Sequence, residues 1–238
     1  MTPSRRAPAS ARTPSRRALA GAPAQARRVL ELLDAHYGRP QWEPRYAPVD
    51  ELVYTVLSQN TADVNTARTF AALSARFPTW RAVRDAPVEE VVAAISLGGL
   101  ATTKAPRIKQ ILAAISSRTG EPDLSELDEM DDGQALRYLQ SLPGVGPKTA
   151  ACVLMFALGR PAMPVDTHVY RLARRLGLLG PKTTVEQAHG LLTELAGPEN
   201  VYSLHVDLVT HGRRVCHARR PECSRCPLAQ ICPSAYSF

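Results

Sequence analysis

The chain lacks a long hydrophobic stretch, which limits the classes of protein to which it can belong. The longest apolar run near its middle, Ala150 to Leu158, has nine residues, whereas a helix that crosses a bilayer needs about 20. Apolar residues nevertheless make up 45% of the 238 residues, enough for a hydrophobic core in one large domain or two small ones. We therefore expect a soluble globular protein that does not associate with membranes.

Sustained period-two alternation, the signature of half-buried strands, is also missing. Apolar residues recur instead at helical spacing almost everywhere from Ala24 onward. The clearest examples are Val29, Leu30, Leu33 and Tyr37, then Leu52, Val53, Val56 and Leu57, then Ile108, Ile111, Leu112 and Ile115. The pattern predicts an all-α fold of short helices, separated by many of the 20 prolines.

Acidic residues are absent from the first part of the chain, since Glu31 is the first of them. Seven of the 29 basic residues precede it, and the remaining 22 balance the 22 acidic residues, so the net charge of +7 lies in this segment. Residues 1–24 hold almost no large apolar side chain and are predicted to be a disordered basic tail. A flexible arm with nonspecific DNA affinity is favoured over a mitochondrial transit peptide, because repeated prolines interrupt the helix that such peptides form.

Cysteine is rare except near the end of the chain. Four of the five cysteines are Cys216, Cys223, Cys226 and Cys232, spaced C-x6-C-x2-C-x5-C. The chain shows no secretion signal, so a four-thiolate metal site is favoured over disulfides. Zinc sites usually contain two C-x2–4-C pairs and only one is present, which favours an iron–sulfur cluster over zinc. We expect Cys152, in an apolar helix, to be an inert core residue.

A glycine- and proline-rich stretch, SLPGVGPKTAA from Ser141 to Ala151, precedes an apolar run. We predict a helix over 132–141, a tight turn over 142–146 in which Gly144 and Gly146 can adopt positive φ, and a second helix over 147–158. Such a helix-hairpin-helix leaves free backbone N–H groups at a helix N-terminus, where a phosphate can bind without readout of the base sequence. A plain antiparallel helix pair is the alternative.

Two charged residues near this turn suggest chemistry. The amine of Lys148, in its neutral form, can attack a sugar C1′ atom and form a Schiff base, although a lysine here can also be an ordinary solvated residue. Asp166 begins the stretch DTHVYRLARR and is well placed to cap the next helix,. A carboxylate beside Lys148 can also accept a proton and stabilise positive charge on the sugar, and the two roles are compatible.

The three motifs LPGVGPKTA, VDTHVYRLARRLGL and C-x6-C-x2-C-x5-C together resemble the endonuclease III family of DNA glycosylases, over roughly Val29 to Cys232. The resemblance implies a six-helix barrel domain over residues 44–160. A second domain, made of 25–43 and 161–238, would carry a four-iron, four-sulfur cluster, and damaged duplex DNA would lie in the cleft between the two. It further implies that Lys148 is the nucleophile and that Asp166 assists it.

The same resemblance assigns DNA contacts. The hairpin backbone of Gly144, Val145 and Gly146 would hold phosphates, Gln59 or Asn60 would insert toward the orphaned base, and Leu100 would wedge the opposite strand. Independently of the resemblance, five arginines near the cysteines form a basic patch: Arg213, Arg214, Arg219, Arg220 and Arg225. Of these, Arg219 and Arg220 above all are expected to contact phosphates, although such a run can also be a solvated face. The family loop often reads Ser-Ala-Gln-Ala-Thr-Asp, whereas SQNTAD stands here, and Pro147 replaces a common arginine.

The resemblance further implies a monomeric base excision repair enzyme that removes oxidised pyrimidines such as thymine glycol and cleaves 3′ to the abasic site by β-elimination. Relatives that act on mismatches lack the lysine. A mismatch-specific glycosylase of the same superfamily and a noncatalytic DNA-binding or redox module are the alternatives. The expected location is the cytoplasm or nucleoid of a prokaryote, or the mitochondrion or nucleus of a eukaryote.

Overall fold

The computed structural model describes residues 21–237, and the predicted tail before residue 21 lies outside them. Within this range every regular element is a helix, which confirms the all-α prediction. The α-helices are α2 (Ala22–Tyr37), α3 (Pro48–Ser58), α4 (Asp63–Arg76), α5 (Trp80–Asp85), α6 (Val88–Ala94), α7 (Ala101–Thr119), α8 (Asp132–Ser141), α9 (Pro147–Leu158), α10 (Thr167–Arg175), α11 (Val185–Ala196) and α12 (Val201–Arg214). Short 3-10 turns are η1 (Ser96–Gly98), η2 (Ser125–Glu129), η3 (Pro198–Asn200) and η4 (Cys223–Arg225).

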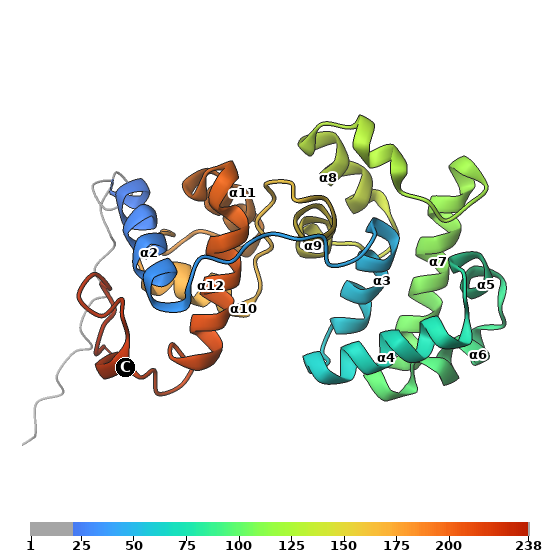
Figure 1. Ribbon diagram of the computed structural model, residues 1–238, viewed down its shortest axis with the longest axis horizontal. Coiled ribbons are helices and arrows are strands. Elements are labelled where there is room, and N and C mark those ends of the chain that lie inside the picture. The colour runs from blue at the N-terminus through green and yellow to red at the C-terminus, as the bar shows by residue number, and fades with distance from the viewer. Residues whose placement is uncertain (1–20, 238) are drawn as a thin grey trace, which may run out of the picture.

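The helices form two groups, each around its own buried apolar cluster (Figure 1). The first cluster runs from Val49 to Ala162 and is enclosed by α3 to α9. The second combines residues of α2 with residues from Met155 to Leu228. The first and last parts of the described chain therefore pack together, and α3 to α8 lie apart from them.

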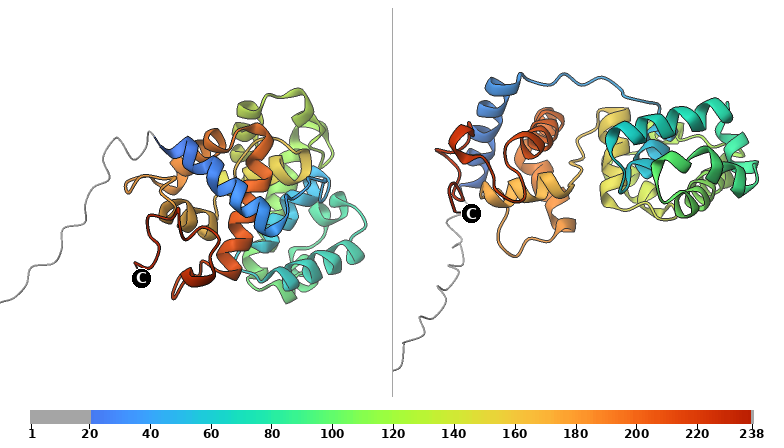
Figure 2. Two further views of the ribbon diagram at one scale, coloured as in Figure 1. Left: turned by 60° about the vertical axis from the view of Figure 1, so that its left-hand side comes forward. Right: turned by 90° about the horizontal axis from the view of Figure 1, so that it is seen from below.

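Helix α2 begins earlier than the sequence suggested. It starts at Ala22, with Pro23 in its first turn, so the predicted disordered tail 1–24 is too long at its C-terminal end. Proline suits a first turn because the N–H group that it lacks has no partner inside the helix. The helix stops at Gly38, whose φ of +81° ends it as expected. Residues 38–47 then run in extended form across to α3, as Figure 2 shows from below.

Helix α9 belongs to both groups. Val153 and Leu154 lie in the first cluster and Met155 lies in the second. A helix that is buried on several sides has no polar face, and this explains the continuous apolar run from Ala150 to Leu158. In the described part of the chain no helix is both long and apolar enough to span a bilayer.

Candidate active site and metal centre

The predicted hairpin is present with the predicted boundaries. Helix α8 ends at Ser141, residues 142–146 turn, and α9 begins at Pro147. The N–H of Val145 donates to the carbonyl of Leu142 at 3.1 Å, which closes the turn. Glycine, proline and a helix cap are local signals, so the sequence alone could place this element.

The two hairpin glycines differ in what they require. Gly144 has a φ of +70°, so the backbone conformation favours glycine, and a Cβ there would lie 2.7 Å from Nε of Arg107, whose side chain would have to move,. Gly146 has a φ of −92° and open space around it, so the expectation of a positive φ does not apply to it. The side chain of Val145 is buried, which leaves only its backbone for a DNA contact.

No side chain caps the N-terminus of α9. Its first N–H groups are thus available to an external acceptor, and the helix dipole favours an anion at this end. Lys148 lies in this first turn and is half-buried. One exposed helix start thus combines backbone donors with a side-chain amine.

Lys148 and Asp166 line the same two cavities between the helical groups. One cavity, of about 340 Å³, also contacts Ser58 of α3 and His205 of α12. The other, of about 520 Å³, extends to the loop that holds Gln59 and Asn60, and its walls also include Thr61, Thr167 and His168. An amine and a carboxylate therefore face a space large enough for a small ring.

Asp166 caps α10 as predicted. Its Oδ1 accepts the N–H of Val169 at 2.8 Å, and this contact fixes the side chain at the cavity wall. The hydrogen bond uses one of the two carboxylate oxygens, so the other can still act as a proton acceptor. The capping and chemical roles are compatible in this geometry.

Two buried groups near Lys148 and Asp166 stay uncharged. Burial lowers the pKa of His205 to about 4, with opposing contributions from Asp166, which raises it, and Lys148, which lowers it. Burial likewise raises the pKa of the Cys152 thiol. Cys152 is buried as expected, but it lines the cavity rather than only filling the core. Both groups present neutral surfaces to whatever occupies this space.

An ion pair joins the two helical groups at the edge of both cavities. Arg213 of α12 donates to Asp63 at the start of α4, with Nη1 and Oδ2 2.6 Å apart and Nη2 and Oδ1 3.3 Å apart. Both side chains are more than half exposed, so solvent screens the pair and it adds little to stability,. Sequence reasoning placed Arg213 in a basic patch but could not find its partner.

The two loops expected to enter DNA are exposed and strained in the same way. Asn60 and Leu100 are non-glycine residues with a φ of +53°, a conformation that costs free energy and is kept where the surroundings impose it. Leu100 is 54% exposed, so it is not an ordinary core leucine. Gln59 is half-buried and Asn60 is exposed, which makes Asn60 the more accessible of the two.

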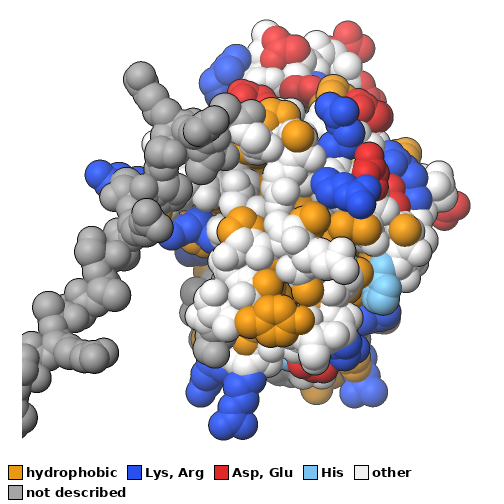
Figure 3. Space-filling model, turned by 90° about the vertical axis from the view of Figure 1, so that its left-hand side faces the viewer, with side chains coloured by type: hydrophobic (Ala, Val, Ile, Leu, Met, Phe, Trp, Pro, Cys, Tyr) orange, Lys and Arg blue, Asp and Glu red, His pale blue; other side chains and the backbone are white. Residues whose placement is uncertain are grey.

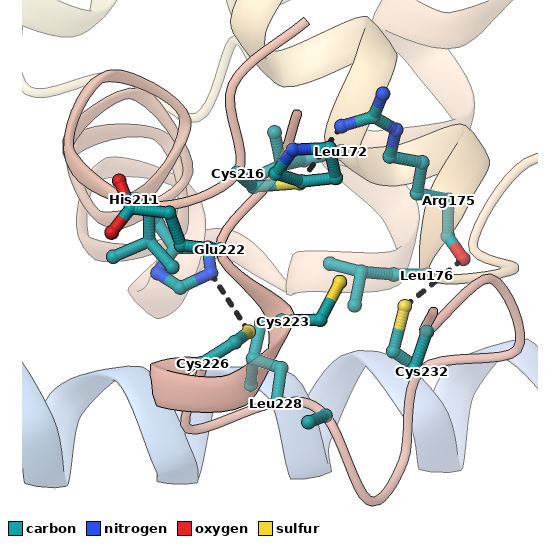
Figure 4. A pocket seen from close by; sticks show the side chains of 14 residues that line it. Leu172, Arg175, Leu176, His211, Cys216, Glu222, Cys223, Cys226, Leu228 and Cys232 are labelled. Carbon is teal, nitrogen blue, oxygen red and sulfur yellow. Dashed lines mark hydrogen bonds between the residues drawn. The ribbon is translucent and has the colours of Figure 1, made fainter. Parts of the chain in front are cut away.

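The four C-terminal cysteines surround one apolar cavity together with Leu172, Leu176 and Leu228. Figure 4 shows their sulfur atoms facing this shared space. All four are free of disulfides. Burial and the neighbouring thiols raise the pKa of Cys226 and Cys232, and a bound cationic centre would offset that cost.

Hydrogen bonds surround the sulfur atoms. Nη1 of Arg175 donates to Sγ of Cys216 at 3.2 Å, and Nε2 of His211 lies 3.2 Å from Sγ of Cys226. The hydroxyl of Tyr37 is 2.9 Å from Nδ1 of the same histidine. Such donors stabilise thiolates and orient them.

Two findings bear on the kind of group that the four cysteines could hold. Within residues 21–237 no three His, Cys, Asp or Glu side chains converge closely enough to hold a single ion. Four cysteines nevertheless share one cavity. A multi-iron cluster binds each cysteine through a different iron atom, so four cysteines around one cavity fit such a cluster.

Arg219 and Arg220 lie on the exposed segment between Cys216 and Cys223. Figure 3 shows this end of the molecule, where basic side chains occur in both the upper and the lower part and acidic ones gather mostly toward the upper edge. The other arginines of the patch are engaged: Arg213 binds Asp63, Arg214 lies over the ring of Tyr37, and Arg225 binds Glu222. Arg219 and Arg220 are the freer pair.

The chain matches two family models. Residues 53–198 match the HhH-GPD superfamily of base excision DNA repair proteins, and residues 216–232 match the iron–sulfur binding domain of endonuclease III. The chain thus binds an iron–sulfur cluster through its C-terminal segment. The larger match covers more than half of the chain.

Individual relatives agree. A putative DNA glycosylase of Arabidopsis thaliana is 38% identical over 69% of this chain, and the match spans 56% of that protein. Endonuclease III of Synechocystis sp. is 35% identical over 79% of this chain and 82% of the relative. A solved structure described as a trapped endonuclease III–DNA covalent intermediate aligns over 90% of this chain and 97% of that one, with a TM-score of 0.77 and 28% identity. The chain therefore belongs to the HhH-GPD superfamily and is an endonuclease III-like DNA glycosylase of base excision repair.

Proposed function

We propose that the protein is a bifunctional glycosylase and abasic-site lyase that removes oxidised pyrimidines, such as thymine glycol, from duplex DNA and acts as a monomer. The supporting observation is that Lys148 and Asp166 share the walls of two adjoining cavities beside the uncapped start of α9. A nucleophile, a carboxylate and a phosphate-binding helix end are the groups that this chemistry needs. The trapped covalent structure of an endonuclease III relative supports a covalent step.

In the proposed reaction the lone pair of Lys148 Nζ forms a bond to C1′ while the bond from C1′ to the base breaks. The base leaves with that electron pair and takes up a proton. Loss of a proton from the attached nitrogen and opening of the sugar ring give the Schiff base between C1′ and Nζ. Asp166, whose second oxygen is not used for capping, is proposed to accept the amine proton and to stabilise the positive charge that develops on the sugar.

Strand cleavage follows from the Schiff base. Removal of a proton from C2′ allows a double bond to form between C2′ and C3′ while the bond from C3′ to the phosphate oxygen breaks. Water then hydrolyses the Schiff base and releases the sugar fragment from Lys148. The reaction needs no oxidant or reductant. The hairpin backbone from Gly144 to Gly146 is proposed to hold the nearby phosphate, and Asn60 or Gln59 to fill the gap left by the extruded nucleotide.

For the cofactor we propose a four-iron, four-sulfur cluster held by Cys216, Cys223, Cys226 and Cys232. Its role is structural, because it fixes the segment that carries Arg219 and Arg220. Freshly purified protein is then brown, with broad visible absorption and about four irons per chain. A colourless protein with one zinc ion per chain would refute this assignment.

The reaction is tested by borohydride reduction in the presence of DNA that contains an abasic site. A covalent complex is expected with the native chain and with Lys182→Ala, which removes an exposed lysine elsewhere, and no complex with Lys148→Ala. A complex that persists in Lys148→Ala would overturn the nucleophile. Duplex binding without turnover on any lesion would instead support the noncatalytic alternative.

A further inference from the structure

Arg45 lies in the wall of the 340 Å³ cavity, although it precedes every helix of the first group. It shares this wall with Tyr54, Thr55, Cys152 and Phe156. Its backbone N–H donates to the carbonyl of Phe156 at 3.0 Å, which attaches this end of the extended segment to α9. A cationic side chain thus enters a cavity whose nearby walls are largely aromatic or neutral.

The guanidinium of Arg45 is held in one orientation. Nε donates to Oε2 of Glu51 at 2.9 Å, and Nη2 donates to Oε1 of the same carboxylate. Glu51 is fully buried and also accepts the hydroxyl of Thr55 at 2.9 Å. The guanidinium carbon lies 4.2 Å from the ring centre of Phe156 and 4.8 Å from that of Tyr54. A bidentate contact on one edge and two aromatic rings leave it little freedom to turn.

One edge of the guanidinium is free. Among the described residues Nη1 of Arg45 has no hydrogen-bond partner, and 37% of the side chain is exposed. Burying a charged pair costs as much desolvation as it gains in attraction, so stability alone is a weak reason to keep one here. The arrangement instead presents a fixed, charged donor to the cavity.

The distance between Arg45 and Lys148 bears on which end of an extruded base can contact the Arg45 guanidinium. Phe156, against which the guanidinium stacks, follows Lys148 by eight residues on α9, or about 12 Å along the helix axis,. In a pyrimidine, O2 is next to the bond to the sugar and the group at position 4 is at the opposite end of the ring. Because Lys148 and Arg45 line the same cavity, a base whose C1′ is at Lys148 can reach Arg45 with position 4 rather than with O2.

We infer that Arg45 is a specificity-determining residue that donates a hydrogen bond to a carbonyl oxygen at position 4 of the extruded base. The inference rests on the proposed function and narrows its substrate to lesions of the uracil and thymine type. Arginine has donors and no acceptor, so a 4-amino group, as in lesions of cytosine, meets it donor to donor. A site built to hydrogen-bond one partner rejects the mismatched one strongly.

The test uses duplexes that carry 5-hydroxyuracil, 5-hydroxycytosine or an abasic site at the same position. The first two differ at position 4 and in the protonation of N3, and the third has no base. We expect the native chain to prefer 5-hydroxyuracil in kcat/KM by at least about tenfold, as loss of a charge-assisted hydrogen bond predicts. Equal rates on the two bases would overturn the inference.

The main variant is Arg45→Met with Glu51→Gln, because removal of Arg45 alone would leave Glu51 buried and unpaired. Glu51→Gln alone is the matched control, since the amide oxygen can still hold the guanidinium. We expect the double variant to lose the preference between the two bases and the control to keep it. Abasic-site cleavage should stay within about twofold in both.

A preference that survives in the double variant would refute the role of Arg45. So would an equal loss on all three substrates in a variant whose circular dichroism matches the native chain, because that loss would mean a general defect. If the native chain cleaves no abasic DNA, the proposed function itself fails. The abasic duplex therefore separates the two failures.

Discussion

The ammonium of Lys104 lies 2.6 Å from the hydroxyl oxygen of Thr61, deep between the two loops that approach the cleft. The same nitrogen donates to the carbonyls of Leu57 at 2.7 Å and Gly98 at 3.1 Å. Lys104 is 4% exposed, so three oxygen acceptors hold a buried cation. One side chain thus ties the loop that contains Asn60 to the loop that contains Leu100.

Lys104→Met should loosen both loops, because two carbonyls and a hydroxyl lose their common donor. We expect a loss of about 1–3 kcal/mol in the free energy of unfolding and a fall in lesion excision from duplex DNA. Urea unfolding and single-turnover excision measure the two effects. Lys109→Met is the matched control, since Lys109 donates to backbone carbonyls in the last turn of α5 and just after it, and it lines neither of the two cavities. Excision that is lost equally in both variants would contradict a specific role for Lys104.

Leu100→Ala should weaken action on duplex DNA, because the exposed side chain would no longer fill space opened in the base stack,. We expect excision from a duplex to slow by about tenfold, because the lost apolar contact of a few methyl groups is worth on the order of 1–2 kcal/mol. Cleavage of a single-stranded abasic oligonucleotide should be unchanged. Leu97→Ala is the control, because Leu97 is 65% exposed on the neighbouring η1 turn. Equal effects of the two substitutions would argue against a wedge at Leu100.

Arg219→Ala or Arg220→Ala should weaken binding to damaged and undamaged duplexes to the same extent. The reason is that phosphate contacts carry no sequence information and each releases about one counterion, so the slope of affinity against salt should fall by about one. Titrations at several salt concentrations measure it. Arg81→Ala, on α5 at the far end of the first helical group (Figure 1), should change neither quantity. A larger loss on damaged DNA would mean that this segment reads the lesion.

Asp207 gives the protein a specific dependence of stability on pH. It is 1% exposed on α12, and burial together with the nearby carboxyl of Asp34 raises its pKa to about 7. Between the unfolded pKa near 4 and about 7, the native state holds a proton that the unfolded chain releases. Its contribution to stability is therefore present at low pH and is lost as the pH rises to about 7 and beyond.

Asp207→Asn should remove this dependence, since the amide can donate to Asp34 at every pH. Relative to the native chain we expect the variant to gain stability between pH 5 and pH 8, by at most about 4 kcal/mol. Urea unfolding at several pH values measures the difference, and comparison of the two chains cancels the contributions of the buried histidines. Parallel curves for the two chains would show that Asp207 does not hold the proton.

Local features of the site could be predicted from the sequence and long-range ones could not. The ends of α8 and α9 and the cap at Asp166 depend on residues a few positions apart, so glycine, proline and aspartate were sufficient signals. The start of α2 was missed because alanine and proline are compatible with both a tail and a first helical turn.

Tertiary pairs gave no comparable signal. Asp63 and Arg213 are 150 residues apart and meet only because the two helical groups approach each other. Arg45 precedes the first group, and its contact with Phe156 depends on the path of residues 38–47. The exposure of Leu100 likewise follows from its left-handed backbone, which leucine does not favour by itself,.

The shared position of α9 couples the cluster end of the molecule to the cleft. Unpacking Met155 on one side exposes the same helix that holds Val153 and Leu154 on the other, so the two hydrophobic cores should melt in a single cooperative transition,. Oxidative damage to the iron–sulfur segment would then also destabilise the first turn of α9, which carries Lys148.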